Sequence, residues 1–217
     1  MCAVMMKERT HHIRMSAGDR RRQLLDAALT VFSRKGFKGT ATKEIAVAAG
    51  VAEAVIFQHF PSKEALYNAV LDTSMGDLVT EQDAEEIRNR MERGDDEGVF
   101  RMIILGILNH YRTNAAFQRV VLFAALEGHE QGLNRLWEQK APLFKQFHEY
   151  IEKRQREGAL AAGDPFAILL GIGGAAHHYG LVTGIMNTII SNIPDEAIAD
   201  QLTKILLDGI RKQGSAD

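Results

Sequence analysis

The residues with the most distinctive chemistry lie between positions 34 and 63, in the segment RKGFKGTATKEIAVAAGVAEAVIFQHFPSK. The spacing of its apolar residues predicts two short helices, a tight glycine turn between them and a cationic exit at Lys63. Ala54, Val55 and Gln58 would face outward from the second helix. A two-helix unit of this shape lays its second helix in the major groove of DNA. The segment therefore predicts a DNA-reading surface.

Start and stop signals define the two helices. Thr42 can cap the first helix through its hydroxyl group, and Gly50 supplies the left-handed residue that ends it. The second helix spans roughly residues 53–60 and turns Ile56 and Phe60 toward the first. The small apolar face of the first helix consists of Ile45, Ala48 and Ala49.

Two further helices are expected on either side of this unit. Residues 20–35 have apolar side chains at helical spacing, with Asp19 or Ser16 as the start signal and Gly36 as the stop signal. Ser62 can cap the helix that follows. The apolar positions of these two helices are Leu25, Ala28, Leu29, Phe32, Leu66, Val70 and Leu71. Short helices bury little by themselves, so the amino-terminal unit should pack against the rest of the chain.

Composition indicates a soluble globular protein with unevenly distributed charge. The chain has 217 residues, of which 46% are hydrophobic and 25% charged. Residues 1–63 contain 11 Lys and Arg against 5 Asp and Glu, a net charge of +6, whereas residues 64–217 contain 15 against 23, a net charge of −8. A basic head on an acidic body favours phosphate contacts at one end of the molecule.

The first residues give no sign of export. The single cysteine, Cys2, excludes an internal disulfide, and the apolar run at residues 1–6 is too short for a signal sequence. We therefore expect a cytoplasmic protein. Residues 1–16 lack periodicity and are expected to form a flexible arm, or reflect an upstream start with Met15 as the alternative.

The pattern LLDAALTVFSRKGFKGTATKEIAVAAGVAEAVIFQHFPSKEALYNAVL resembles the amino-terminal domain of TetR-type transcriptional regulators, over about residues 20–72. The helix lengths, the AGV turn, the aromatic-x-His-Phe run and the Ser-Lys-Glu start of the next helix all coincide. The resemblance implies an all-helical homodimer whose carboxy-terminal domain binds a small molecule and thereby releases operator DNA. Any such coupling is expected to act through the helix after Ser62, the only covalent connection between head and body.

The resemblance also implies a division of the chain and a set of DNA contacts. A helix-turn-helix DNA-binding domain would span residues 17–63, and a helical-bundle domain for ligand binding and dimerisation would span residues 64–217. Glu53, Ala54 and Gln58 would face bases, because Glu can accept from cytosine, Ala can meet the thymine methyl group and Gln can pair with adenine. The other implied contacts are Thr42, Lys43, Val55, Phe57, His59 and Lys63.

The chain departs from the family pattern at three positions. Ala52, Val55 and Phe57 stand where the family usually has Ser, Thr and Tyr, which removes a helix cap and two hydroxyl groups that could reach phosphates. Phe57 is therefore expected to pack rather than to contact DNA. Affinity should depend more on Lys43, Lys63 and the cluster Arg20, Arg21 and Arg22, although that cluster could also be a solvated helix start. His59 fits a packing role and a phosphate contact equally well.

Residues 81–98 form an intensely charged stretch, with 8 acidic and 3 basic side chains. We expect a solvated helix end and loop that link the head to the body. The stretch lacks the alternating ligand spacing of a calcium loop, so it does not predict a metal site.

Beyond this stretch, apolar residues indicate a helical bundle. Between Phe100 and Tyr111 they cover most of a helix's circumference, which is typical of a helix in the middle of a bundle. A second apolar helix is expected before Gly128, and an apolar stripe follows Pro142. Core packing explains any single residue, yet a bundle interior is also where a small apolar effector, such as a drug-like, aromatic or acyl compound, would bind. The candidates for lining it are Phe100, Ile103, Ile107, Phe123, Phe144, Phe147, His177 and His178.

Residues 165–194 contain no Asp, Glu, Lys or Arg, and by length alone they could span a membrane. The adjacent His177 and His178, the interspersed glycines and polar residues, and the acidic borders argue against a span. Two helices of a dimer interface, at residues 165–187 and 194–211, explain the pattern better, and the resembled family dimerises through such a pair. The interface candidates are Gly173, Gly174, Gly180, Gly184, Ile198, Leu202 and Ile205.

The competing class is a helical-bundle small-molecule-binding protein or enzyme without a DNA role. His177 and His178 point about 100° apart on a helix, so they cannot bind one metal in the i, i+4 manner. Two His-Glu pairs, at residues 129–130 and 148–149, begin like a zinc helix but lack the second His. With no phosphate loop, nucleophile elbow or cysteine suited to catalysis, the sequence predicts neither an enzyme nor a cofactor.

Overall fold

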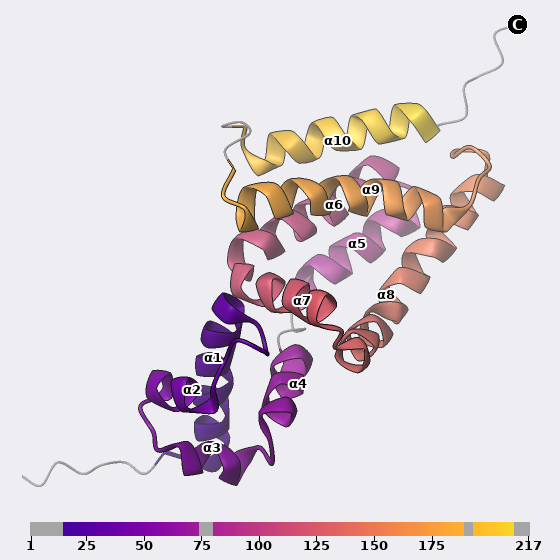
Figure 1. Cartoon of the computed structure of the whole chain (residues 1–217). Helices are drawn as coiled ribbons and strands as arrows, with labels where there is room; N and C mark the ends of the chain where they lie inside the picture. The colour runs from indigo at the N-terminus through magenta and orange to yellow at the C-terminus, as the bar shows by residue number, and fades with distance from the viewer. Residues whose placement is uncertain (1–14, 74–79, 189–192, 211–217) are drawn as a thin grey trace, which may run out of the picture.

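The computed structural model describes residues 15–73, 80–188 and 193–210. Within these ranges the chain forms ten α-helices and one short π-helix, arranged as a small head and a larger helical body (Figure 1). The all-α prediction is confirmed. The predicted arm lies outside the described residues, except for Met15 and Ser16.

The head begins with the helices that the start and stop signals predict: α1 (Ala17–Lys35), α2 (Thr42–Ala49), α3 (Glu53–His59) and α4 (Lys63–Thr73). Ser16 caps α1 by accepting a hydrogen bond from the Asp19 backbone N–H at 3.1 Å. Gly36 ends α1 at φ 68°, and Gly50 ends α2 in the left-handed region at φ 65°. Glycine suits both positions because it has no Cβ to oppose a positive φ.

The predicted cap at Thr42 is wrong by one residue. Ala41 is the N-cap of α2 and has no side-chain oxygen, so Glu44 reaches back and accepts a hydrogen bond from the Ala41 backbone N–H at 3.1 Å. The Thr42 hydroxyl group donates instead to the carboxylate of Glu53 on α3. Glu44 also pairs with Lys35, and this bond, followed by the bond from Ala41, lowers the pKa of Glu44.

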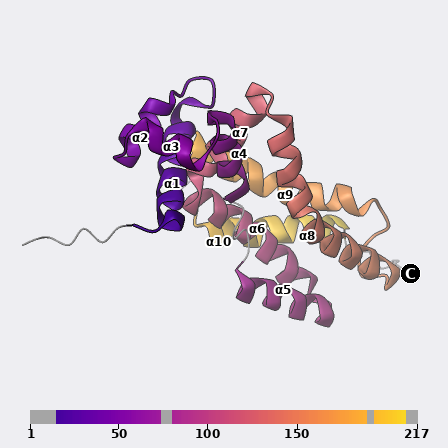
Figure 2. The ribbon, with the colours of Figure 1, turned by 90° about the horizontal axis from the view of Figure 1, so that it is seen from below.

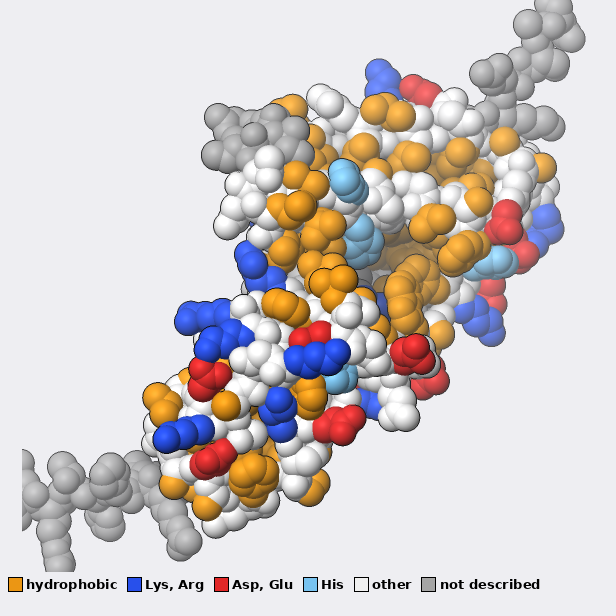
Figure 3. Space-filling view, viewed as in Figure 1, with side chains coloured by type: hydrophobic (Ala, Val, Ile, Leu, Met, Phe, Trp, Pro, Cys, Tyr) orange, Lys and Arg blue, Asp and Glu red, His pale blue; other side chains and the backbone are white. Residues whose placement is uncertain are grey.

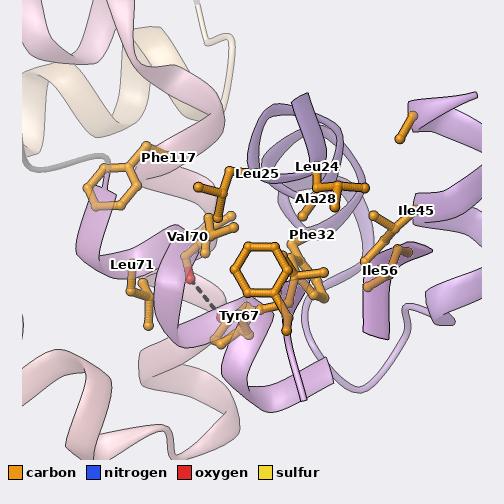
Figure 4. Close-up of a cluster of buried hydrophobic side chains, with 14 of the residues drawn as sticks. Leu24, Leu25, Ala28, Phe32, Ile45, Ile56, Tyr67, Val70, Leu71 and Phe117 are labelled. Atoms are coloured by element: carbon orange, nitrogen blue, oxygen red, sulfur yellow. Dashed lines mark hydrogen bonds between the residues drawn. The ribbon is translucent and has the colours of Figure 1, made fainter. Parts of the chain in front are cut away.

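The head shares its core with the body, through α7 (Ala115–Glu127) and α8 (Glu130–Arg156). Tyr67 of α4 meets the ring of Phe32 edge-on, with 4.8 Å between centroids, and its hydroxyl group donates to the Val120 carbonyl oxygen at 3.2 Å (Figure 4). Phe117 of α7 and Leu136 of α8 complete this cluster. The expectation that the head packs against the body is confirmed.

The charged stretch at residues 81–98 is not a linker loop, so that expectation is wrong. It forms α5 (Glu81–Arg93) and the first turn of α6 (Asp96–Thr113). Ile87 and Met91, one helical turn apart, are buried in the body core while the acidic side chains face outward. Asp96 is itself buried and accepts hydrogen bonds from Tyr150 at 2.5 Å and Arg154 at 2.8 Å.

Helix α6 is the centre of the body. It packs against α5, α7 and two later helices, α9 (Pro165–Gly180) and α10 (Asp195–Ile210). Figure 2 shows α6 between α5 on one side and α9 on the other. Its buried residues include Phe100, Ile104 and Leu108, as its apolar circumference predicts.

Helix α8 is longer than the sequence suggests, because it runs through Pro142 without ending there. Proline lacks the N–H that would close one helical bond, but the turns on both sides continue and keep Leu136 and Phe147 buried in different clusters. Helix α9 starts after Asp164, whose side chain accepts from the Phe166 backbone N–H at 2.8 Å, and continues into the π-helix η1 (Leu181–Ile185). Residues 165–185 are long and apolar enough to cross a membrane, with a mean hydropathy of 1.3, and only 22% of that window is buried.

Candidate nucleic-acid interface

The corner between α2 and α3 determines which face α3 presents. Ile45 of α2 and Ile56 of α3 lie next to each other in the head core (Figure 4), and the Val51 backbone N–H donates to the Ala46 carbonyl oxygen at 3.0 Å. With Ile56 buried, Gln58 is left at the solvent-exposed side of α3. A short helix held by its buried face can thus present its other side to a groove.

The outer face of α3 consists of Ala54, Phe57 and Gln58. Phe57 is 47% exposed, so the structure does not bury it in the core as the sequence suggested. Val55 and His59 are half-buried at the two sides of this face. The face therefore offers one amide and an apolar surface formed by a methyl group and an aromatic ring.

Glu53 and Thr42 are brought together at the start of α3, where the Thr42 hydroxyl group donates to the Glu53 carboxylate. This bond ties the first turn of α3 to the first turn of α2. A carboxylate at a helix amino terminus is also favoured by the helix dipole. Both residues lie at the α2–α3 corner, but each already has a partner within the protein.

The basic residues of the head fall into two groups. Lys43 and Arg22 are exposed and make no contact with another described side chain of the head, whereas Arg21, also exposed, and the half-buried Arg20 each make one. Arg21 lies over the ring of Phe60 at 4.7 Å, and Arg20 donates to the Gln23 side chain at 2.7 Å. From the sequence, the three arginines are expected to act as one cluster. In the described part of the chain, Arg20 and Arg21 contact other side chains of the head, and Arg22 does not.

Lys63 has a structural partner that the sequence did not indicate. Its ammonium group donates to the carbonyl oxygens of Phe37 at 2.8 Å and Thr40 at 2.9 Å, and it lies 4.1 Å from the centre of the Phe37 ring. These contacts fix the loop between α1 and α2 against the start of α4. Lys63 therefore stabilises the head through contacts within the protein, in addition to any contact with a DNA phosphate.

Sequence reasoning missed Val47, which is 73% exposed on α2. Val47 lies two residues after the buried Ile45, so helical spacing places it on the opposite side of α2 and could have identified it. An exposed valine beside Lys43 extends the apolar and basic surface of the α2–α3 unit.

Comparison with known proteins decides the identity of this unit. Residues 24–70, which span most of α1 and all of α2 and α3, match the family model described as bacterial regulatory proteins, tetR family. These residues form an amino-terminal domain of the tetR family. Members of this family are helix-turn-helix regulators and not enzymes.

Relatives of this chain include two helix-turn-helix regulators. The chain is 32% identical over 106 residues to the uncharacterized regulator YvkB of Bacillus subtilis, covering 46% of this chain and 55% of YvkB. It is 30% identical over 130 residues to the repressor NicS of Pseudomonas putida, covering 59% of this chain and 58% of NicS. The chain thus spans about half the length of the curated relatives it matches.

The whole fold is similar to that of AibR, whose crystal structure holds isovaleryl coenzyme A and operator DNA. The TM-score is 0.64 at 18% identity, over 87% of this chain and 98% of AibR. At this level of identity the similarity concerns the fold alone. It covers both the head and the body.

Within the part of the chain that the structure describes, the predicted effector-binding residues do not line one common cavity but lie in different environments. Phe100 and Phe147 are buried in the body core, and Phe144 is exposed beside Trp137, with ring centroids 5.8 Å apart. Phe123 of α7 lies against the end of α1, where a Cβ atom at Gly36 would come within 2.8 Å of its ring. The half-buried members of the set are Phe123 and, on α6, Ile103 and Ile107. His177 and His178 are both exposed, and the Nδ1 atom of His177 lies 3.3 Å from the Tyr111 hydroxyl group.

The glycines predicted for a dimer interface differ in which atoms of the chain lie close to them. A Cβ atom at Gly180 would lie 2.4 Å from the ring of Tyr111, and one at Gly184 would lie 3.4 Å from the Tyr111 carbonyl oxygen. Both glycines therefore permit close packing of α9 and η1 on α6 within the chain. Gly173 has only Ile107 nearby, at 3.9 Å, and Gly174 has no atom within 4 Å.

The exposed side of α9 is largely apolar, whereas on α10 a single large apolar residue is exposed among charged and polar ones. Among the interface candidates on α10, Ile205 is 66% exposed, whereas Ile198 and Leu202 pack partly against the body core. Phe166 and Leu170, one turn apart on α9, are also exposed. The sequence named neither of these two residues, although their i, i+4 spacing marks one side of the helix.

A second link between head and body was not predicted. The carboxylate of Glu127, at the end of α7, accepts hydrogen bonds from the backbone N–H groups of Phe37 at 2.8 Å and Lys38 at 3.1 Å. His129 lies 3.6 Å from the same carboxylate and stacks edge-on against Phe37. The loop after α1 is thus held directly by the body, so α4 is not the only physical connection.

Proposed function

We propose that this protein is a ligand-responsive transcriptional regulator, a repressor, that binds a palindromic operator as a homodimer and is released by a small effector. Residues 17–63 would serve as the DNA-binding domain and residues 64–217 as the ligand-binding and dimerisation domain. The observation that carries the proposal is the exposed face of α3, where Ala54, Phe57 and Gln58 project from a helix held by the buried Ile56.

Two homologous regulators support the regulatory part of the proposal. NicS is named a transcriptional repressor, and AibR was crystallised with an acyl coenzyme A and operator DNA. A conformational change caused by an effector in the body could be transmitted to the head through α4 and through the hydrogen bonds of Glu127 to the α1–α2 loop. By thermodynamic reciprocity, operator DNA would then weaken effector binding by the same factor by which the effector weakens DNA binding.

We propose that a second copy of the chain covers the exposed apolar side chains of α9 together with Ile205 of α10. Apolar side chains such as Phe166, Leu170 and Ile205 lose free energy when they leave water, and a two-fold dimer would bury the same face of both copies. Dimerisation would also explain residues 165–185 without a membrane, in agreement with a soluble cytoplasmic regulator.

DNA binding can be tested with the exposed residues Gln58 and Lys43. Gln58→Ala should lose about 1 to 3 kcal/mol of discrimination at one base position, because an amide that pairs with adenine reads sequence. Lys43→Ala should weaken operator and random DNA alike, because a phosphate contact carries no sequence information. Fluorescence anisotropy on operator and scrambled duplexes measures both effects. Equal losses on both duplexes for Gln58→Ala would remove Gln58 from the base-reading residues.

A further inference from the structure

Lys140 is a half-buried cation in the body without an acidic partner. Within residues 80–188 and 193–210, each half-buried arginine has an oxygen partner. Arg90 pairs with Asp95, Arg101 with Asp200, Arg135 with Asp72 and Arg154 with Asp96, while Arg119 donates to the Ile185 carbonyl oxygen. No carboxylate among the described residues lies within 4 Å of the Lys140 ammonium group. A partly desolvated charge without a counter-ion is unfavourable, so a bound anion beside the Lys140 ammonium group would be stabilising.

Two histidines on neighbouring helices lie near enough to Lys140 for its charge to act on them. His110 and Tyr111 lie on α6, and His177 lies on α9, with its Nδ1 3.3 Å from the Tyr111 hydroxyl. Burial lowers the pKa of His110, and the nearby Lys140 and His177 lower it further. Burial followed by the charge of Lys140 also lowers the pKa of His177, and burial lowers that of Lys140. The charge of Lys140 on α8 therefore acts on one histidine of α6 and one of α9.

The hydrogen-bond roles at His177 leave a donor free. A neutral imidazole accepts through one nitrogen and donates through the other. When the Tyr111 hydroxyl donates to Nδ1, the ring proton is on Nε2, which has no partner in the described chain. His177 thus keeps an N–H group that can donate to an anion.

Apolar surface adjoins the cation. Trp137 lies one turn before Lys140 on α8, with 5.8 Å between its ring centre and the ammonium group, and Phe144 lies one turn after it. Figure 3 shows a hollow on this face of the body, between α7, α8 and α9, bordered by hydrophobic and histidine side chains. A ligand with a charged end and an apolar chain would match this combination.

We propose that Lys140, assisted by His177, binds the carboxylate of an amphipathic effector whose apolar part lies against Trp137 and the neighbouring apolar residues. The inference rests on the proposed function, because it identifies the chemical class of the effector. It replaces a purely apolar effector with an aliphatic or aromatic carboxylic acid. The charge-assisted hydrogen bonds give selectivity, and the hydrocarbon chain supplies most of the binding free energy.

Trp137 is the only tryptophan in the chain, so its fluorescence reports occupancy of this place. Decanoate and 1-decanol share one chain length and differ in charge. The full-length protein should bind decanoate about 10-fold or more tightly than decanol at pH 7.5. Lys140→Met should abolish this preference while keeping the affinity for decanol, and Lys140→Arg should preserve it. Lys145→Met is the matched control, because Lys145 is exposed on the same helix and pairs with Glu149.

The titration requires no DNA, so its outcome is separate from that of operator release. Absence of decanoate binding, equal affinity for the two probes, or an unchanged preference in Lys140→Met would overturn the carboxylate site. Selective binding that fails to release the operator would support the site and count against the induction mechanism. If decanol and decanoate released the operator at equal concentrations, this result would support the induction mechanism and count against the carboxylate site.

Discussion

At the scale of single residues, the structure separates side chains that hold the head together from side chains that remain available to a ligand. Lys63 and Lys43 are both basic and lie at the two ends of the α2–α3 unit. The sequence predicts DNA contact for both. Only the structure shows that Lys63 is bound to the α1–α2 loop, 23 and 26 residues away along the chain, because neighbouring sequence carries no sign of that contact.

Lys63 should therefore matter for stability. Lys63→Met removes two charge-assisted hydrogen bonds and a cation–π contact from a half-buried site, so it should lower the free energy of unfolding by roughly 1 to 3 kcal/mol. Lys43→Met, at an exposed position, should change it by less than about 0.5 kcal/mol. Urea denaturation of both variants gives the comparison. Equal stabilities would show that the Lys63 contacts contribute nothing measurable.

His110 should make the stability depend on pH. The residue is buried, Asn114 donates to its Nδ1 at 3.2 Å, and its pKa is lowered from 6.5 to about 4, by burial first and then by Lys140 and His177. The folded state thus takes up this proton less readily than the unfolded state. The contribution of neutral His110 to the free energy of unfolding is fully present above pH 6.5. It is lost as the pH falls from 6.5 toward 4, by up to about 3 kcal/mol.

His110→Gln tests this dependence. The slope of unfolding free energy against pH between 6.5 and 4 should be shallower in the variant, as measured by urea denaturation at several pH values. A slope identical to that of the unchanged protein would contradict the assignment to His110.

At the scale of elements, local signals predicted the head better than the body. Ser16, Gly36 and Gly50 mark helix ends through their own backbone and side-chain preferences, so their effect could be read from the sequence. Residues 81–93 could not be recognised as easily, because the acidic composition masks the buried pair Ile87 and Met91. The Glu127 contact joins residues about 90 positions apart and depends on how α7 is placed, which no local pattern specifies.

Glu127 should support the loop between α1 and α2. Glu127→Ala should lower the free energy of unfolding by roughly 1 to 3 kcal/mol, because it leaves two backbone N–H groups without their partner. Hydrogen exchange at the Phe37 and Lys38 amides should become faster, while exchange in α5 and α10 should stay as it is. Glu130→Ala, at an exposed position three residues later, is the control. Unchanged protection at Phe37 would indicate that the carboxylate does not hold the loop.

At the scale of the whole molecule, the charge distribution and the apolar face determine how the protein would act. The head carries the positive excess, and the outer face of α9 and α10 carries exposed apolar side chains. An operator with two-fold symmetry requires two heads about 34 to 36 Å apart, or a multiple of that distance, on one face of the DNA. The proposed dimer would have to place its two heads at this spacing.

Ile205→Glu should disrupt that dimer, because it introduces a charge into an apolar interface. The variant should sediment as a monomer at low micromolar concentration and bind operator DNA at least about 10-fold more weakly, since two linked heads bind more tightly than one. Leu126→Glu, at an 84% exposed position on α7, is the control and should remain dimeric. A dimeric Ile205→Glu protein would place the interface elsewhere.

Selection of bound duplexes from a random DNA library by the purified full-length protein tests the central claim most directly. The account predicts enrichment of an inverted repeat whose half-sites lie one helical turn, or a multiple of it, apart. Gln58→Ala should relax the preference at one position in each half-site. Affinity for the selected duplex should fall steeply with salt, by about 0.9 logarithmic units per decade for each phosphate neutralised. Failure to enrich any symmetric sequence, or an enriched sequence unaffected by Gln58→Ala, would contradict operator recognition through α3.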